Sequence, residues 1–436
     1  MAKKIIFLPK KYNLVVGDKF EMFYRGIIRA FNPYLYYVLI ECQKGNYYPR
    51  YYTFTPKEED VGEYELTFKV MDNFGELIDE EKTTLVVNKA VAPKRKVNIL
   101  CIGDSLTSGG YWTKEGYRRF AQEGGEPSGL GFKDSINLIG TNKAEVGGEV
   151  IGHEGYGCWH WKSFISTSGP TRTSAVWLSV NSHNLTEADQ HSVWKNGNNL
   201  WILETIEEKR LKFKRGEGNN GWNPPVVGVM EPVENVVNEE VLEIISYEYE
   251  TGNPFWRDDI KDIDFNWYLK EHGFATPDIV YILLSWNGLY VPYDTEFKLH
   301  SENAPILINK LHKDLPNAKI RIMGITMPSV TGGISANYGC KGPYHDTLGD
   351  IFTCFNYNKW LEDLCEREEY KEYCEFVEVA SQFDTDYNMP YAMVNVNSRY
   401  DEKEMIGNNG VHPMIRGYNQ IGDVFFRSLV KELKEF

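Results

Sequence analysis

The sequence contains no long apolar run. No stretch approaches the roughly 20 consecutive apolar residues that cross a membrane as a helix, and the run from Ile5 to Leu8 is too short for the core of a secretory signal peptide. We therefore expect a soluble protein without a membrane partner. It would be made in the cytoplasm and would leave the cell, if at all, by lysis or another route.

Basic residues are scarce. The chain has 47 Lys and Arg residues against 62 Asp and Glu residues, which gives a formal net charge of -15 at pH 7. Binding to nucleic acid or to an anionic membrane needs clustered basic side chains. The charge balance therefore argues against a nucleic-acid partner, and the surplus of acidic residues mainly favours solubility.

The cysteine pattern indicates neither a metal site nor a disulfide framework. The cysteines are scattered, their number is odd and no pair has the CxxC spacing, so reduced thiols are expected. The seven are Cys42, Cys101, Cys158, Cys340, Cys354, Cys365 and Cys374. His153 and His160 lack the spacing of a helical zinc pair, and no Gly-rich phosphate loop or distinct pair of carboxylates stands out. We expect no metal and no cofactor.

Aromatic side chains, in contrast, are abundant. They make up 14% of the 436 residues and include 28 Tyr and 11 Trp. Two interpretations are open, because aromatic side chains bind flat polar ligands such as sugars and also fill the cores and edges of β-sandwiches. The chain is longer than a usual single domain, which predicts two domains or one domain with a large insertion.

An all-β module is indicated at residues 12–88, where apolar and polar residues alternate with period two between turn signals. Its length and strand spacing suit a small immunoglobulin-like sandwich, although the Cys and Trp pattern of antibody domains is absent. Residues 89–96 are basic and contain Pro93, as in a linker. We assign residues 1–92 to this module and residues 93–436 to a second domain, and we expect a chain that starts near Ala92 to fold.

The second domain has the pattern of a parallel α/β sheet. Continuous apolar runs, typical of strands buried on both faces, alternate with helical patterns. The apolar runs are residues 97–102, 278–284 and 319–325, and the helical patterns are residues 304–315, 356–372 and 417–436. From about residue 171 to about residue 249 the sequence returns to strand-like alternation around the turn Asn196-Gly197, which predicts a β-rich insertion.

Three polar side chains follow these elements at positions suited to catalysis. Ser105 comes directly after the first apolar run, in Gly103-Asp104-Ser105, and open α/β sheets bind ligands outside the carboxyl ends of their strands. Asn287 lies in a turn after the second run, and His412 lies on a loop that leads into the last helix. A serine activated by a histidine is one arrangement for nucleophilic catalysis.

These blocks resemble the SGNH (GDSL) hydrolases, which have a Gly-Asp-Ser nucleophile turn, a glycine, an asparagine after an inner strand and a C-terminal Asp-x-x-His. The resemblance covers roughly residues 97–436 without the insertion. It implies a three-layer, flavodoxin-like α/β fold. It also implies that Ser105 is the nucleophile and one oxyanion donor, Asn287 is a further donor and His412 is the general base.

The residues beside these blocks complete the candidate site. Asp104, Trp159 and Trp286 are the candidate substrate-binding residues. The family glycine can be aligned with Gly157 or, in a second alignment, with Cys158, and either residue would act through its backbone N–H. In the second alignment the Cys158 thiol borders the site without being the nucleophile. The preferred interpretation is that Cys158 is buried and inert.

The acid of the family triad is absent. Asn409 stands where the family has Asp three residues before the histidine, and an amide carries no negative charge to stabilise an imidazolium. Asn409 could orient His412 through its amide oxygen, a backbone carbonyl could do so, or Asp384, Asp386 or Asp401 could reach the ring from neighbouring loops. We favour a dyad oriented by Asn409 or by a carbonyl.

The resemblance also bears on the substrate. Family members with appended β modules suggest an esterase that removes O-acetyl groups from carbohydrate, so the expected partner is an O-acetylated glycan or a small ester. The tail from Phe383 to Tyr418 looks like that of hydrolases encoded by phages and gut Firmicutes, which would suit a protein of a phage virion. The competing interpretation is a glycan-binding or structural protein that kept the hydrolase fold after losing the acid.

Overall fold

The computed structural model describes residues 4–169, 174–216, 226, 228–330, 334 and 346–436. The described residues up to Lys162 and from Leu269 onward form one compact unit, and Ser163–Tyr268 form a second. The predicted start of the insertion at residue 171 and Cys340 lie outside the described residues. The remaining cysteines are free thiols.

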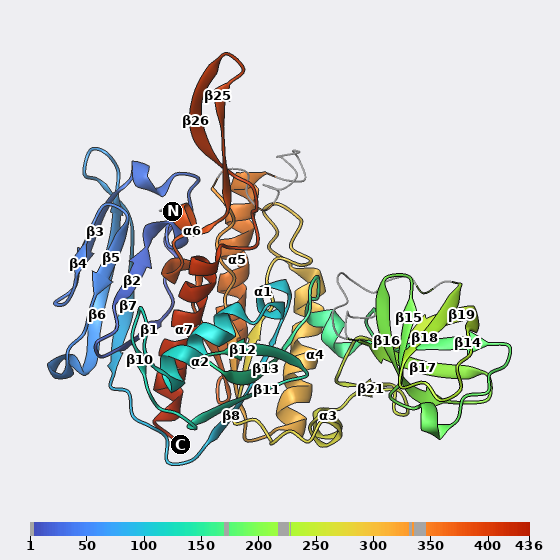
Figure 1. The fold of residues 1–436 in the computed structure, drawn as a ribbon. Coiled ribbons are helices and arrows are strands. Elements are labelled where there is room, and N and C mark those ends of the chain that lie inside the picture. Colours follow the sequence, from blue (N-terminus) through green and yellow to red (C-terminus); the bar gives the residue numbers. More distant parts are fainter. Residues whose placement is uncertain (1–3, 170–173, 217–225, 227, 331–333, 335–345) are drawn as a thin grey trace. The chain divides into compact units, whose positions relative to one another are not determined.

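A mainly parallel sheet runs through the first unit in the strand order β12-β13-β8-β22-β23-β24, with β11 beside the first half of β8 (Figure 1). The strands are β8 (Val97–Gly103), β11 (Ile136–Ile139), β12 (Asn142–Val146), β13 (Glu149–Gly155), β22 (Ile279–Leu283), β23 (Lys319–Met323) and β24 (Cys374–Val377). β8 pairs in parallel with β13 on one side and with β22 on the other, so that Gly155 and Leu283 both lie opposite Gly103. The predicted parallel α/β sheet is confirmed, and the carboxyl ends of these three strands lie side by side.

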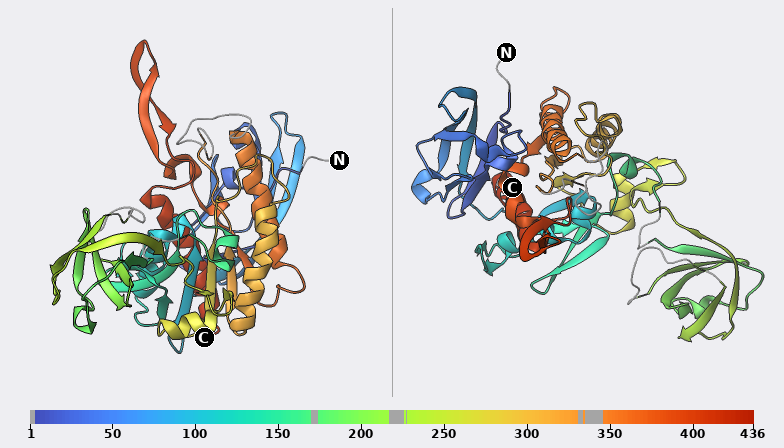
Figure 2. Two further views of the ribbon diagram at one scale, coloured as in Figure 1. Left: turned by 90° about the vertical axis from the view of Figure 1, so that its right-hand side faces the viewer. Right: turned by 90° about the horizontal axis from the view of Figure 1, so that it is seen from above.

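Helices cover both faces of this sheet, with α2 and α7 on one face and α4 and α5 on the other (Figure 2). The helices of this unit are α1 (Ser105–Ser108), α2 (Tyr111–Ala121), α4 (Lys298–Asp314), α5 (Thr347–Cys365), α6 (Thr385–Asn388) and α7 (Ile415–Leu433), and α3 (Phe265–Glu271) spans the boundary between the units. Ile99, Cys101, Tyr281 and Leu283 of the sheet share one buried cluster with Phe425 of α7. Successive side chains of a strand face opposite ways, so both faces are buried and the strands read as continuous apolar runs. Among the described residues, no helix combines the length and the apolar character needed to cross a membrane.

The N-terminal strands form two further sheets, one in the order β1-β7-β6-β3 and one in the order β2-β5-β4. They are β1 (Lys11–Val15), β2 (Phe20–Phe23), β3 (Tyr37–Glu41), β4 (Asn46–Tyr47), β5 (Tyr51–Phe54), β6 (Gly62–Met71) and β7 (Leu77–Asn88). β1 pairs with β7 in parallel, whereas the other neighbours in both sheets are antiparallel. The predicted immunoglobulin-like character stays a prediction.

These N-terminal strands pack tightly on the α/β sheet. Val15 belongs to the same buried cluster as the residues of β8 and α7. The carboxylate of Asp18 accepts hydrogen bonds from Arg119 of α2 and Arg427 of α7, each at 2.6 Å. The three charged side chains are buried, at 5%, 2% and 6% exposure. The expectation that a chain starting near Ala92 folds stays a prediction, and these contacts argue against it.

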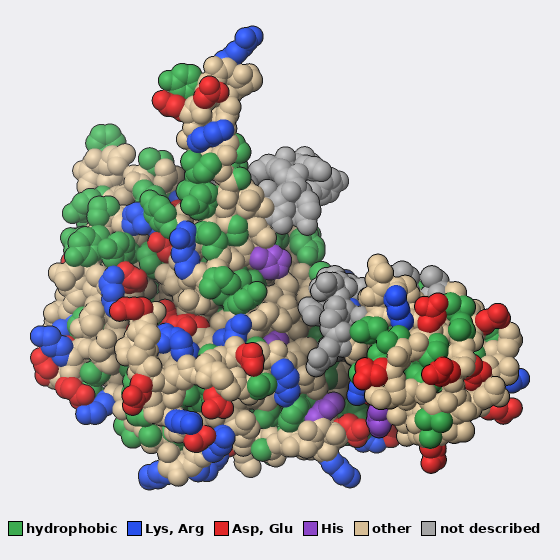
Figure 3. All heavy atoms as spheres, in the orientation of Figure 1, with side chains coloured by type: hydrophobic (Ala, Val, Ile, Leu, Met, Phe, Trp, Pro, Cys, Tyr) green, Lys and Arg blue, Asp and Glu red, His purple; other side chains and the backbone are tan. Residues whose placement is uncertain are grey.

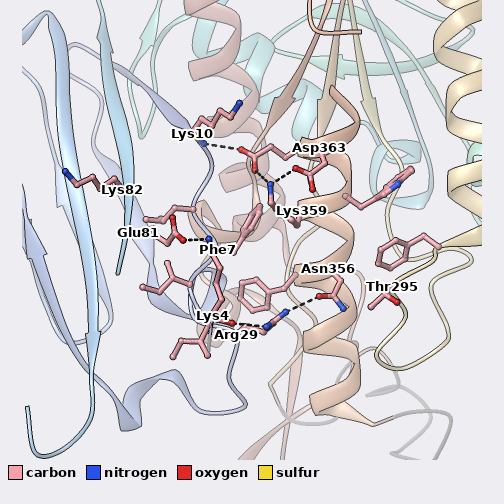
Figure 4. Close-up of a pocket in the computed structure, with 17 residues that line it drawn as sticks. Lys4, Phe7, Lys10, Arg29, Glu81, Lys82, Thr295, Asn356, Lys359 and Asp363 are labelled. Atoms are coloured by element: carbon pink, nitrogen blue, oxygen red, sulfur yellow. Dashed lines mark hydrogen bonds and ion pairs between the residues drawn. The ribbon is translucent and has the colours of Figure 1, made fainter. Parts of the chain in front are cut away.

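A second contact joins the segment before β1 to α5 (Figure 4). The backbone N–H of Lys10 donates to the Glu362 carboxylate at 3.1 Å, and Arg29 donates to the Asn356 side chain at 3.3 Å. Lys359 lies 3.3 Å from the same glutamate. These residues line a cavity of about 650 Å³. Charged groups of both signs are paired around it, so the contact fixes the N-terminal segment.

The second unit contains a closed barrel in the order β14-β17-β16-β15-β18-β19. Its strands are β14 (Val176–Val180), β15 (Val193–Asn196), β16 (Asn199–Ile206), β17 (Arg210–Arg215), β18 (Val229–Glu234) and β19 (Leu242–Tyr249). Trp194 and Trp201 are buried in its core. The tight turn between β15 and β16 contains Gly197 with a φ of 59°. The predicted β-rich insertion is therefore a barrel, a closure that alternation alone does not specify.

The remaining strands form short antiparallel pairs. They are β9 (Glu123–Gly124) with β10 (Gly129–Leu130), β20 (Trp256–Arg257) with β21 (Asp262–Ile263), and β25 (Tyr391–Asn397) with β26 (Tyr400–Gly407). The ribbon of β25 and β26 projects from the first unit between α6 and the loop before α7 (Figure 1). Its residues are mostly exposed, so it adds little to the core.

Asp18→Ala is expected to destabilise the protein strongly. The substitution removes a shared partner of two buried guanidinium groups, and breaking a buried ion pair from one side typically costs about 3–5 kcal/mol. The free energy of unfolding from urea denaturation measures the effect. Glu58→Ala is the matched control, because its ion pair with Lys89 is exposed on both sides and should contribute less than about 1 kcal/mol. Equal losses in both variants would contradict the structural role of Asp18.

Candidate active site

Ser105 is the first residue of α1, directly after β8. The Asp104 carboxylate caps this helix by accepting the N–H of Leu106 at 2.9 Å. At the end of β8 the backbone passes so close to α1 that a Cβ on Gly103 would lie 2.0 Å from Thr107 Oγ1. The sharp turn leaves Ser105 half-buried at the carboxyl edge of the sheet.

His412 reaches Ser105 from the loop between β26 and α7. Its Nε2 lies 2.8 Å from the serine Oγ, although the residues are 307 positions apart in the chain. Burial lowers the pKa of His412 below its ordinary value of 6.5, because it disfavours the charged ring. The neutral imidazole is thus the prevailing form at neutral pH, and it accepts the serine proton at Nε2 when Nδ1 carries the ring proton.

Asn409 holds the loop backbone and not the imidazole ring. Its side-chain oxygen accepts the N–H of Val411 at 3.0 Å and the N–H of His412 at 2.9 Å. A further backbone bond runs from the N–H of Met414 to the carbonyl of Asn388 at 2.9 Å. Within the described part of the chain, no hydrogen bond to Nδ1 of His412 is present. The geometry therefore does not support ring orientation by the Asn409 amide or by a carbonyl.

The other candidate acids are engaged elsewhere. Asp384 pairs with Arg50 at 2.7 Å, and Asp386 pairs with Arg25 at 2.5 Å and with Arg50 at 3.2 Å. Asp401 is exposed in the projecting strand β26. Across the described residues, no carboxylate is hydrogen bonded to His412, and no group of His, Cys, Asp and Glu is arranged to hold a metal ion.

Asn287 links the turn after β22 to two neighbouring loops. Its Nδ2 donates to the Asp104 carboxylate at 3.2 Å and to the carbonyl of Trp159 at 3.0 Å. Asp104 also accepts the N–H of Ser285 at 2.7 Å, and burial raises the pKa of this carboxyl to about 7. Sequence reasoning missed Tyr290, an exposed side chain whose hydroxyl lies 3.3 Å from the Asn287 side-chain oxygen. The sequence feature that could have identified Tyr290 is its position as an aromatic residue three places after Asn287.

Gly157 and Cys158 form the centre of a tight turn after β13. The N–H of Trp159 donates to the carbonyl of Tyr156 at 3.2 Å, and Cys158 has a φ of 67°. The thiol is exposed, so the interpretation of Cys158 as buried was wrong, because a central position in a tight turn directs the side chain outward. Within the described residues, the N–H groups of Gly157, Cys158 and Ser105 make no hydrogen bond.

This turn lies against α1. The N–H of Tyr156 donates to the carbonyl of Gly103 at 2.9 Å. A Cβ on Gly155 would lie 2.5 Å from the backbone of Thr107, so glycine is needed for the close approach of β13 to α1. The pairing brings the turn to the same edge of the sheet as Ser105, where unbonded N–H groups are potential donors to a developing oxyanion.

The candidate substrate-binding residues are buried instead. Asp104, Trp159 and Trp286 are only 1%, 8% and 1% exposed. The Asp104 carboxylate is occupied by the contacts described above, and the Trp159 ring stacks on Tyr156 at 4.4 Å between centroids. The Trp286 indole N–H has no hydrogen-bond partner within the described residues. In this structure the three side chains support the loops of the site and do not face solvent.

Comparisons with known proteins give only distant similarities. No protein-family model matches the sequence, and no curated protein is significantly similar to it. A peptidoglycan O-acetylesterase structure is 12% identical, covers 78% of this chain and 93% of its own, and has a TM-score of 0.33. The periplasmic domain of a lipopolysaccharide acetyltransferase from Salmonella ser. Paratyphi A is 11% identical, with 78% and 85% covered and a TM-score of 0.28. A possible lipase from Chitinophaga pinensis is 13% identical, with 38% and 77% covered and a TM-score of 0.24.

The first prediction for the site concerns the charge of His412. Because burial disfavours the imidazolium, we expect the ring to titrate with a midpoint below 6.5 in an NMR pH titration. The His412→Gln variant identifies the signal. A midpoint at or above 6.5 would show that an unrecognised acceptor stabilises the charged ring.

The second prediction separates two effects of residue 409: holding the loop through its backbone and changing the pKa of His412. In Asn409→Asp a carboxylate oxygen can accept the same two N–H groups, so the loop is kept, and the new negative charge should raise the His412 pKa by up to about one unit. Asn409→Ala removes both bonds without adding charge and should destabilise the loop. NMR titration of His412 in both variants measures the difference. An unchanged midpoint in Asn409→Asp would place the side chain too far from the ring to influence it.

Proposed function

We propose that this chain is a carboxylic ester hydrolase of the SGNH type, with Ser105 as nucleophile and His412 as general base. The observation that carries the proposal is the 2.8 Å contact between His412 Nε2 and Ser105 Oγ. It occurs at the carboxyl edge of a parallel sheet, where open α/β proteins bind ligands. The Gly-Asp-Ser, Asn and His blocks of the sequence support the same assignment.

The proposed reaction is a two-step acyl transfer. His412 takes the proton of Ser105 while the serine oxygen attacks the ester carbonyl carbon, and the same imidazole then gives the proton to the departing alcohol. The oxyanion forms beside α1, within reach of the N–H groups of Ser105 and of Gly157 or Cys158. Water, deprotonated by His412, then attacks the acyl-enzyme and releases the acid together with the free serine.

Asn287 has a conditional part in this scheme. Both N–H bonds of its amide are used by Asp104 and Trp159 in this structure. The side chain can donate to an oxyanion only after one of these bonds is exchanged. Substrate binding would therefore recruit Asn287, while the backbone N–H groups are available from the start.

The missing carboxylate sets the expected rate. In the serine-protease case, replacing the triad Asp by Asn costs about ten-thousandfold in kcat. Here no acceptor stabilises the imidazolium from the Nδ1 side within the described residues. We therefore expect a slow enzyme that is most readily detected on activated esters.

The proposed natural substrate is an O-acetyl ester of carbohydrate. Exposed tyrosines flank the site: Tyr290 touches Asn287, and Tyr111, at 39% exposure, follows α1 and packs on Tyr418 at 5.0 Å. Tyrosine offers an apolar ring and a polar hydroxyl, which suits sugar rings. A second candidate is a glycan-binding protein without catalysis. The engaged Asn287 amide favours it, as does the lack of a partner for Nδ1 of His412 within the described residues.

Hydrolysis of p-nitrophenyl acetate separates the two candidates. We expect Ser105→Ala and His412→Ala to reduce the rate to background while circular dichroism shows a folded protein. Ser398→Ala is the control, because it removes an exposed hydroxyl from the turn between β25 and β26 and should leave the rate nearly unchanged. Acetate release from acetylated xylan by the wild type and not by Ser105→Ala tests the substrate class. Equal rates in wild type and Ser105→Ala would sink the esterase proposal.

A further inference from the structure

We infer that the N-terminal strands carry a second binding site, for a neutral carbohydrate, in a tyrosine-lined pocket of about 350 Å³. Its lining includes Tyr24, Tyr34, Tyr36, Tyr37, Tyr47 and Tyr48. They come from η1 (Tyr24–Gly26), from η2 (Pro33–Leu35) and the residues after it, and from β4 and the turn that follows. Hydrophobic and tyrosine side chains gather on the surface of the N-terminal strands (Figure 3). None of the proposed catalytic residues belongs to this pocket, so the inference goes beyond the proposed function.

The exposed rings match the chemistry of a sugar. Tyr37, Tyr47 and Tyr48 are 55%, 41% and 47% exposed, and each combines an apolar ring face with a hydroxyl that donates and accepts hydrogen bonds. A pyranose ring has the same combination of apolar C–H faces and hydroxyl groups. The Tyr48 ring stacks on Tyr51 at 5.2 Å, which fixes its orientation before a ligand arrives. Such ordered aromatic side chains lose little conformational entropy on binding.

An unsatisfied polar atom also belongs to the lining. Tyr24 is only 1% exposed, and its buried hydroxyl lies beside the backbone N–H of Tyr48 but has no acceptor for its own proton within the described residues. Buried hydroxyl groups are nearly always hydrogen bonded, because an unpaired one costs free energy. A ligand hydroxyl in the pocket would provide the missing partner.

The charge of the pocket favours a neutral ligand. Arg50 is the charged side chain among the lining residues, and it is neutralised by Asp384 and Asp386 at 2.7 Å and 3.2 Å. Nucleic-acid bases also stack on aromatic rings, but their phosphates require cations that are free to pair. The pocket volume lies at the small end of the range for ligand sites, about 300–1,000 Å³. Together these features select a short segment of an uncharged glycan.

The pocket and the candidate active site belong to the same compact unit. Arg50 lines the pocket and pairs with residues in and next to α6, and the carbonyl of Asn388 in α6 accepts the N–H of Met414 in the loop after His412. We expect a glycan chain long enough to reach from the pocket to Ser105 to be present there at a raised effective concentration. A faster hydrolysis of polymers through this site rests on the proposed function, whereas the binding of glycan to the pocket does not.

Isothermal titration calorimetry on the full chain with Ser105→Ala tests the site without hydrolysis. The probes are cellotetraose, xylotetraose, mannotetraose and chitotetraose, and we expect at least one to bind. Adding Tyr37→Ala and Tyr47→Ala together should weaken that binding on the order of tenfold, since two stacking contacts are lost. Tyr400→Ala is the matched control, because Tyr400 is similarly exposed, at 53%, but lies in β26. The Ser105→Ala, Tyr400→Ala protein should bind the same tetrasaccharide with the affinity of the Ser105→Ala protein.

Several outcomes overturn the inference. These are failure of all four tetrasaccharides to bind, binding that survives the double substitution, and tighter binding of an oligothymidylate than of any sugar. If the double variant does not fold, Tyr47→Phe keeps the ring and removes one hydroxyl, and it should still weaken binding measurably. The double variant with Ser105 intact should hydrolyse p-nitrophenyl acetate at the wild-type rate. Sugar binding without esterase activity, or the reverse, then shows which of the two proposals has failed.

Discussion

The parallel pairing of β8 with both β13 and β22 is the constraint on which the candidate site depends. Because Gly155 and Leu283 lie opposite Gly103, the turns that follow these strands start at one level of the sheet. The absence of side chains at Gly103 and Gly155 lets both strands approach α1, where any Cβ would collide with Thr107. Ser105, the turn of Gly157 and Cys158, and the turn of Asn287 are thereby placed at one edge of the sheet although they are distant in the sequence. The chemistry of the site is thus a consequence of strand register and of two close backbone contacts.

The histidine is positioned by a different principle. It lies on a loop, so no strand register fixes it, and the loop is held by side-chain and backbone bonds from Asn409 and from α6. α6 is in turn held through Asp384 and Asp386 by two arginines of the N-terminal module, Arg25 in η1 and Arg50 in the turn before β5. Two of the carboxylates considered as a triad acid, Asp384 and Asp386, instead attach α6 to the N-terminal module. The loop is stabilised through its backbone, and among the residues that the structure describes no carboxylate bonds to Nδ1 of His412.

Several features could be predicted from sequence because they depend on local pattern. The apolar runs at residues 97–102 and 278–284 correspond to β8 and β22. Strands buried on both faces are apolar at nearly every position, so a continuous apolar run identifies them. The start of α5 could not be predicted in the same way: the helix begins at Thr347, capped by Asp346, and buries the polar residues Asp350 and Thr353, so no simple apolar stripe marks it. In the candidate site, too, some features have a local sequence pattern and others depend on packing between distant segments. Motif order paired Ser105 with His412, and their side chains lie 2.8 Å apart, while their catalytic roles stay a prediction. The burial of Trp286 and the exposure of Cys158 depend on packing between distant segments and have no local sequence pattern.

The buried pairing of Asp18 with Arg119 and Arg427 has a consequence for synthesis on the ribosome. Asp18, Arg119 and Arg427 are far apart in the sequence, so the cluster cannot close before α7 has left the exit tunnel. The barrel strands, in contrast, are contiguous between Val176 and Tyr249 and need no later residue to complete their sheet. Domains fold as units as they emerge. The barrel can therefore fold before β24 and α7 have been synthesised. We expect the incomplete α/β sheet to be the part of the nascent chain that most needs chaperones.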